Sequence, residues 1–79
     1  MNYDATIHMT VKEVRAALAR RSEFRLLDIS GGNSYGYDWA IVRRDEPKHY
    51  LLTSSDVKRT DGRYPSVFDR AAVEELFAA

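Results

Sequence analysis

The 79-residue chain contains no cysteine, so neither a disulfide framework nor a thiolate metal site is available to support its fold. No apolar run approaches the roughly 18 residues that cross a membrane, and residues 1–10 lack the basic and apolar blocks of a signal peptide. Lysine and arginine (12) balance aspartate and glutamate (12), which disfavours non-specific nucleic-acid binding and an acidic DNA mimic alike. We therefore expect one cytoplasmic domain, residues 1–79, stabilised by packing.

The sequence also offers little for catalysis. His8 and His49 lie far apart, and a zinc site would need two further ligands from carboxylates. No serine stands in a nucleophile elbow, and the acidic pairs 45–46 and 74–75 are better placed to solubilise a turn and a helix face than to act as an acid and a base. Residues 31–36 are glycine-rich, but a strand rather than a helix follows them, unlike a phosphate loop. We expect that the chain is not an enzyme and that it binds no cofactor or metal ion.

What the chain does contain is a central block of strand-forming residues. β-branched and aromatic residues fill three segments bounded by turn formers, namely 24–30, 37–43 and 49–53. The connections 31–34 and 45–48 are too short for a helical crossover, so hairpins must join the segments. The pattern predicts an antiparallel three-stranded meander.

Alternation along each segment assigns side chains to the two faces of the sheet. In the first strand, Leu26, Leu27 and Ile29 do not alternate, so either both faces are partly covered or a bulge intervenes. The third strand is expected to place Tyr50 and Leu52 together, opposite its odd-numbered residues. Apolar groups left uncovered on either face would form an interface.

A helix is predicted on each side of the meander. Thr10 and Glu13 match a capping box, which starts a helix that should end near residues 20–22. Ser66 is interpreted as the N-cap of the second helix, with Asp69 at its third position. Its expected apolar stripe comprises Phe68, Ala72, Val73, Leu76 and Phe77. Residues 5–9 are either a short edge strand or an extended lead-in. The predicted fold is α+β, in the order helix, three strands, helix.

Residues 54–65 form the longest polar stretch, with a single aliphatic side chain and a turn at Asp61 and Gly62. Loops of this length in a small domain are often functional or disordered. The alternative is a solvated connection from the sheet to the last helix.

Aromatic and basic residues interleave in and beside the predicted sheet, and tyrosine, tryptophan and arginine are enriched at interface hot spots. Trp39 is expected to be buried against a helix. The candidate partner-binding residues are Tyr35, Tyr37, Arg43, Arg44, Lys58, Arg59, Arg63 and Tyr64.

The order helix, three-stranded meander, helix resembles that of double-stranded-RNA-binding domains and of small toxin ribonucleases of the HicA kind. The first family has a lysine-rich start to its second helix, where this chain has residues 66–70 (Ser-Val-Phe-Asp-Arg). The second has Gly-Ser-His opening its second strand, where this chain has residues 35–37 (Tyr-Gly-Tyr). The resemblance therefore implies a fold and no activity.

We expect a small non-enzymatic protein-binding domain, a regulator or phage-type inhibitor similar in size and character to anti-CRISPR proteins, that sterically occludes a larger protein or nucleoprotein complex. Alanine at Arg63 and Tyr64 should then abolish partner binding and leave the melting temperature unchanged. The alternative is a nucleic-acid-binding module that contacts phosphates through the loop and strand-end arginines. A homodimer paired through its exposed sheet is the third hypothesis.

Overall fold

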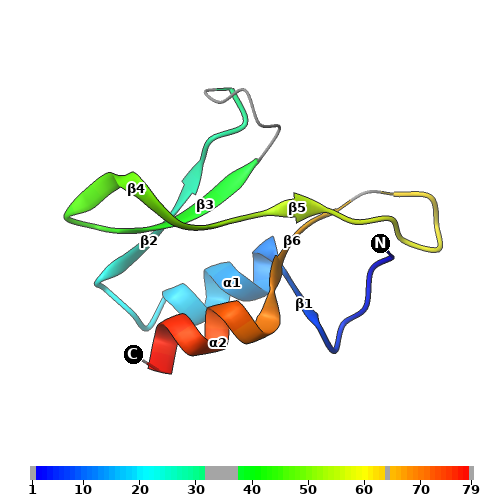
Figure 1. Ribbon diagram of the computed structural model, residues 1–79, viewed down its shortest axis with the longest axis horizontal. Coiled ribbons are helices and arrows are strands. Elements are labelled where there is room, and N and C mark those ends of the chain that lie inside the picture. Colours follow the sequence, from blue (N-terminus) through cyan, green and yellow to red (C-terminus); the bar gives the residue numbers. More distant parts are fainter. Residues whose placement is uncertain (1, 32–37, 64, 79) are drawn as a thin grey trace.

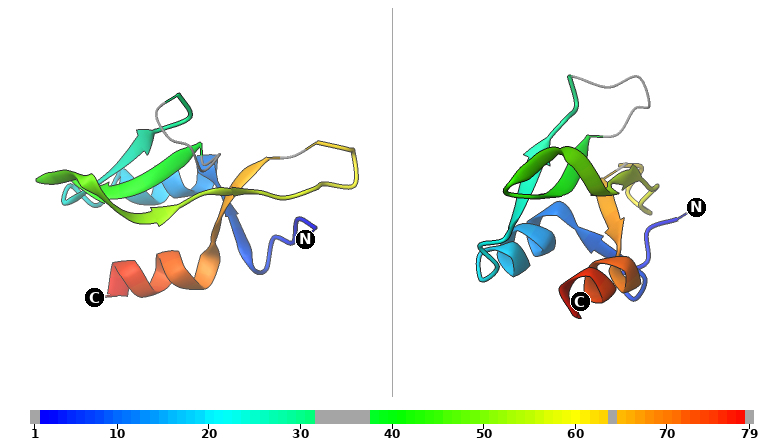
Figure 2. Two further views of the ribbon diagram at one scale, coloured as in Figure 1. Left: turned by 45° about the horizontal axis from the view of Figure 1, so that its top comes forward. Right: turned by 60° about the vertical axis from the view of Figure 1, so that its left-hand side comes forward.

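The computed structural model describes residues 2–31, 38–63 and 65–78. Its elements follow the order β1 (His8–Thr10), α1 (Val11–Leu18), β2 (Phe24–Asp28), β3 (Trp39–Arg43), β4 (Glu46–Thr53), β5 (Ser55–Asp56), β6 (Ser66–Asp69) and α2 (Arg70–Ala78). The fold is α+β, as predicted, but it has two antiparallel three-stranded sheets, ordered β2-β3-β4 and β1-β6-β5. Both helices lie on the same side of the β2-β3-β4 sheet (Figures 1 and 2).

The predicted meander is confirmed, with shifted boundaries. β2 and β3 pair regularly from Phe24 with Arg43 to Asp28 with Trp39. β4 begins at Glu46, so Pro47 belongs to the strand and not to the predicted turn at 45–48. Proline is tolerated here because β4 is an edge strand. Most of the predicted turn at 31–34 lies outside the described residues.

A bulge in β4 overturns one predicted face. Ile41 pairs with Leu52 while Val42 pairs with Tyr50, so Leu51 is an extra residue on the β4 side. Leu51 and Leu52 consequently both pack against the main core. The prediction that Tyr50 and Leu52 share a face was wrong, because the bulge interrupts the two-residue alternation.

The start of the second predicted helix was also wrong. Residues 66–69 form β6, the central strand of the β1-β6-β5 sheet, and its Val67 and Phe68 are 1% exposed. The helix starts at Arg70, and its cap is Asp69, whose Oδ1 accepts the Ala72 amide proton at 3.1 Å. β1 on one side and β5 on the other supply backbone partners that hold Ser66 and its neighbours extended.

The first helix has the predicted capping box. The Thr10 side chain accepts the Glu13 amide proton, and Glu13 accepts that of Thr10. α1 ends at Leu18, earlier than expected. Arg21, expected near the C-terminus of α1, serves α2 instead: its Nη1 donates to the Phe77 carbonyl at 3.1 Å, and its guanidinium lies over the Phe77 ring.

Both faces of the meander are partly covered, which agrees with the irregular pattern of β2. The main core lies between the sheets and the helices and comprises Met9, Val14, Phe24, Ile41, Phe68 and Val73. Leu26 packs against this cluster, whereas Leu27 packs against Ile29, Ala40 and Val42 on the opposite face. Trp39 packs against the main core, on the face of the meander that the helices cover, and the Arg15 guanidinium lies over its ring.

Ser54 joins the two sheets. β4 and β5 form one extended segment that leaves the meander and enters the second sheet (Figure 1). At the junction, the buried Ser54 donates its amide proton to the Trp39 carbonyl at 2.8 Å, and its Oγ accepts the Trp39 amide proton at 3.0 Å. The segment therefore passes between sheets without leaving these backbone groups unpaired.

The side chain of Arg70 links the N-terminal region to α2. Its Nη2 donates to the His8 carbonyl at 3.0 Å and to Glu13 Oε2 at 3.1 Å, and its Nε donates to the Ala5 carbonyl at 3.2 Å. The Arg70 amide also donates to the Ile7 carbonyl. We call this set of contacts the Arg70 clasp. It fixes the segment before β1 against the starts of both helices.

The clasp predicts a pH dependence for stability. Hydrogen bonds from the Thr10 amide and then from Arg70 lower the pKa of Glu13 below its ordinary value of 4.5. The folded state therefore favours the carboxylate, so its stabilisation is complete above pH 4.5 and is lost as the pH falls through the lowered pKa. Glu13→Gln keeps the capping geometry, and it should lower the free energy of unfolding by about 0.5 kcal/mol at pH 6.

Urea titrations at pH 6 and at pH 3 test this expectation. The difference between the wild type and Glu13→Gln should shrink at the lower pH. Asp4 and Asp28 also have lowered pKa values, from bonds with Thr6 and Ser30, but they titrate in both proteins and cancel in the comparison. A difference that stays constant between the two pH values would contradict the assignment.

Candidate functional site: a basic hairpin arm

The polar segment after β5 is a β-hairpin. Val57 donates its amide proton to the Pro65 carbonyl at 3.2 Å, and Arg59 donates to the Arg63 carbonyl at 2.7 Å. We call residues 57–63 the arm. It continues the second sheet and projects at one end of the longest axis of the molecule (Figure 1). Val57 is buried at its base, and residues 58–63 are exposed.

The tip of the arm has a defined turn, as the Asp61 and Gly62 pair predicts. The Gly62 amide donates to the Arg59 carbonyl at 3.1 Å, and Gly62 has a φ of +82°, which side chains rarely adopt. Asp61 Oδ1 also accepts the Arg63 amide proton at 3.0 Å. A three-residue loop ending in left-handed glycine is a common hairpin connection. The local sequence thus specifies the tip.

The N-terminal segment braces the arm. Asn2 forms a parallel bridge with Lys58, and the Tyr3 amide donates to the Lys58 carbonyl at 2.7 Å. The Tyr3 ring contacts both the Arg59 guanidinium, 5.4 Å from its centroid, and the His8 ring, whose centroid is 6.0 Å away at an interplanar angle of 23°. These contacts fix Arg59 relative to β1.

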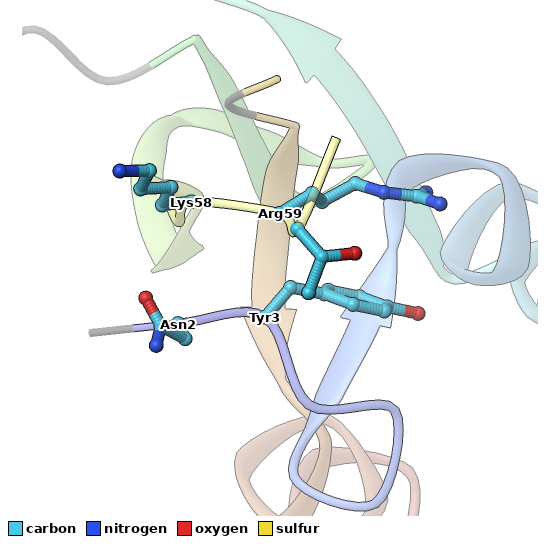
Figure 3. A pocket seen from close by; sticks show the side chains of 5 residues that line it. Asn2, Tyr3, Lys58 and Arg59 are labelled. Atoms are coloured by element: carbon cyan, nitrogen blue, oxygen red, sulfur yellow. The ribbon is translucent and has the colours of Figure 1, made fainter. Parts of the chain in front are cut away.

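A pocket of about 460 Å³ lies where the N-terminal segment meets the arm. Asn2, Tyr3, Lys58, Arg59 and Thr60 line it. Figure 3 shows the Lys58 and Arg59 side chains pointing in opposite directions, as neighbours on a strand do, with Arg59 extending over Tyr3. The two cations that line the pocket, Lys58 and Arg59, therefore do not converge on one point.

The arm concentrates positive charge, although the chain as a whole has a formal net charge of zero. It carries Lys58, Arg59 and Arg63 against a single carboxylate, that of Asp61. Asp61 Oδ2 lies 3.7 Å from Arg59 Nε and 3.9 Å from Arg63 Nε. In the described part of the chain, no other carboxylate forms an ion pair with these cations. Such exposed pairs add little stability.

The structure brings together only some of the predicted site residues. Lys58, Arg59 and Arg63 share the arm. Arg43 and Arg44 lie at the β3–β4 hairpin, at the opposite end of the 37 Å longest axis (Figure 1). Their guanidiniums are engaged there, Arg43 over the Phe24 ring and Arg44 with the Ser22 carbonyl at 2.9 Å. The predicted residues Tyr35, Tyr37 and Tyr64 lie outside the described residues.

Sequence reasoning missed Asn2 and Tyr3. Their contacts with the arm join residues more than 50 positions apart in the chain. No local pattern announces such a contact, because Tyr3 stands in a short polar lead-in without periodicity.

Two carboxylates meet one hydroxyl at the base of the arm. Ser66 Oγ lies 3.0 Å from Asp38 Oδ2 and 2.9 Å from Asp56 Oδ1. A hydroxyl has one proton, so it donates to one of them at a time. Over residues 2–31, 38–63 and 65–78, no group of three or more acidic or histidine side chains could hold a metal ion. The cluster links Asp38, the residue before β3, with β5 and β6.

Comparisons with protein-family models, curated proteins and solved structures give no match for this chain. Of the two helices described, neither is long and apolar enough to cross a membrane.

Proposed function

We propose that this chain is a small non-enzymatic protein-binding domain, a regulator or inhibitor, that docks onto a larger partner through the arm and sterically blocks the surface it covers. The observation that carries the proposal is the arm itself. Main-chain bonds, the Gly62 turn and the Tyr3 brace hold an exposed basic hairpin in one conformation. Binding through a pre-ordered hairpin avoids the entropic cost of ordering a flexible loop.

The charge of the arm indicates the character of the partner surface. Lys58 and Arg63 are exposed, and the Arg63 side chain is 84% accessible. Arginine on a fixed backbone forms bidentate bonds with carboxylates and is common at interface hot spots. We therefore propose an acidic surface on the partner, which would also speed association through electrostatic steering.

A charge-reversed arm tests the proposal. The double variant Lys58→Glu/Arg63→Glu should weaken partner binding by more than about tenfold. Tagged wild-type protein is used to isolate the partner from nuclease-treated lysate of its own host, and calorimetry with the purified partner then compares the variants. Circular dichroism should show an unchanged melting temperature, because both side chains are exposed.

The matched control is Lys12→Glu/Lys48→Glu. It makes the same change in net charge, with one exposed lysine on α1 and another on β4. The control should bind as the wild type does. Equal losses in both double variants would mean that net charge, and not the arm, governs binding, and the proposal would fail.

Nucleic-acid binding is the second candidate, favoured by three cations on one hairpin, an element that can enter a major groove. Each phosphate contact gives a slope of about −0.9 in log affinity against log salt. Because Arg43 and Arg44 lie at the other end of the molecule, the arm would give a slope no steeper than about −3. Binding to duplex DNA or RNA that shows this slope and disappears in the arm variant would favour this candidate.

A further inference from the structure

We infer that the Asp61 carboxylate competes with a carboxylate group of the partner for the guanidinium groups of Arg59 and Arg63. The inference rests on the proposed function and deepens it, because it identifies Arg59 and Arg63 as the receptor for one acidic side chain. It also assigns to Asp61 the role of weakening that contact.

The first step is the placement of the two arginines. The Arg59 amide donates to the Arg63 carbonyl across the hairpin, so the two residues are cross-strand partners. Partners directly opposite each other project from the same face. Arg59 is held over the Tyr3 ring, while Arg63 is largely in solvent. The arm thus presents one fixed and one adaptable guanidinium side by side.

The second step is the position of the carboxylate between them. Asp61 Oδ2 lies 3.7 Å from Arg59 Nε and 3.9 Å from Arg63 Nε. Hydrogen bonds between guanidinium and carboxylate are shorter, about 2.7–2.9 Å. Asp61 therefore neutralises part of the charge without occupying the donors at bonding distance. An incoming carboxylate can form those shorter bonds, but it must do so against the charge of Asp61.

The third step is the choice between an acidic peptide and a nucleic acid. The receptor is one pair of guanidiniums at the tip, and the rest of the chain adds no net positive charge. Affinity for a phosphate backbone increases with the number of cations spread along its length, because each one can neutralise a phosphate. A single acidic side chain on a protein segment needs only this pair. The geometry thus fits a glutamate or aspartate presented by a partner protein.

The variant Asp61→Asn removes the negative charge of this side chain and keeps its size and shape. Asparagine keeps an Oδ1 that can accept the Arg63 amide proton, and Asn-Gly is a favoured pair in tight hairpin turns. The control is Asp45→Asn, which makes the same charge change at the turn between β3 and β4, at the other end of the molecule (Figure 1). Backbone amide spectra verify that both variants keep the fold.

The experiment is an NMR titration of the labelled full chain with a hexaglutamate peptide in low salt. Amide shifts should move in the arm, Asp61→Asn should bind about threefold to tenfold more tightly than the wild type, and Asp45→Asn should match the wild type. Lys58→Glu/Arg63→Glu should abolish the arm shifts.

Three results overturn the inference in distinguishable ways. If Asp61→Asn binds no more tightly while the charge-reversed arm loses binding, the competitor role is wrong and the proposed function stands. If the charge-reversed arm still binds the peptide, the proposed function fails as well. If an oligonucleotide of equal charge binds the arm more tightly than the peptide, the choice of an acidic protein segment is wrong.

Discussion

Replacing Phe68 with alanine is expected to lower the free energy of unfolding by about 3–5 kcal/mol. Phe68 is 1% exposed and lies in β6, between β1 and β5, where it contributes to the main core with Val14 and Ile41. Removing the ring deletes buried apolar surface and leaves a cavity that a central strand does not readily collapse to fill. A chain of this length has a total stability of about 4–12 kcal/mol, so the expected loss is a large fraction of the total.

Urea denaturation followed by circular dichroism measures this effect. The matched control is Phe77→Ala, at the C-terminal end of α2, where the ring is half-buried and 5.7 Å from the Phe24 ring. The control should lose less stability, because its site borders solvent and can relax. A larger loss for Phe77→Ala than for Phe68→Ala would contradict the placement of β6 at the centre of the fold.

Replacing Arg70 with alanine is expected to cost about 2 kcal/mol. The change removes the bonds to the Ala5 and His8 carbonyls and the ion pair with Glu13. The side chain is 28% exposed and that of Glu13 is 44% exposed, so the ion pair itself contributes little. The larger loss comes from the two carbonyl bonds, because they hold the segment before β1 against α2.

Two further variants separate these contributions. Arg70→Lys keeps the charge but lacks the planar fork, so it should recover only part of the lost stability. Arg63→Ala removes an arginine that is 84% exposed, and it should leave the free energy of unfolding within about 0.5 kcal/mol of the wild type. Full recovery by lysine would mean that charge, and not the set of hydrogen bonds, makes the clasp.

The elements that the sequence predicted well have local causes. The capping box at Thr10 and Glu13 lies within four residues, and the Asp61 and Gly62 turn depends on glycine accepting a positive φ. The meander follows from strand-forming residues joined by short connections. Each of these can be derived without knowing which distant residues lie nearby.

The misassigned elements depend on distant partners. Residues 66–69 match a helix cap in sequence, yet pairing with both β1 and β5 keeps them extended. The bulge at Leu51 arises from the fit between β3 and β4. Arg21 lies near the end of α1 in the chain but caps α2 in space. In each case a tertiary contact overrides the local conformational preference of the sequence.

The candidate site shows the same division. Lys58, Arg59 and Arg63 could be grouped from the sequence because they are neighbours in the chain. Arg43 and Arg44 were grouped with them, but the fold places that pair at the far end of the molecule (Figure 1). The Tyr3 brace was missed because it depends on a contact between Tyr3 and Arg59, which lie far apart in the chain.

The sequence by itself determined the class of fold, the meander, the start of α1 and the basic character of the arm, since these depend on residues close together in the chain. Only the tertiary structure decided that a second sheet exists, that β6 is its centre and that Tyr3 fixes Arg59. The physical reason is that a short apolar run such as Val67 and Phe68 fits a helix or a strand equally well until backbone partners on both sides satisfy its hydrogen bonds.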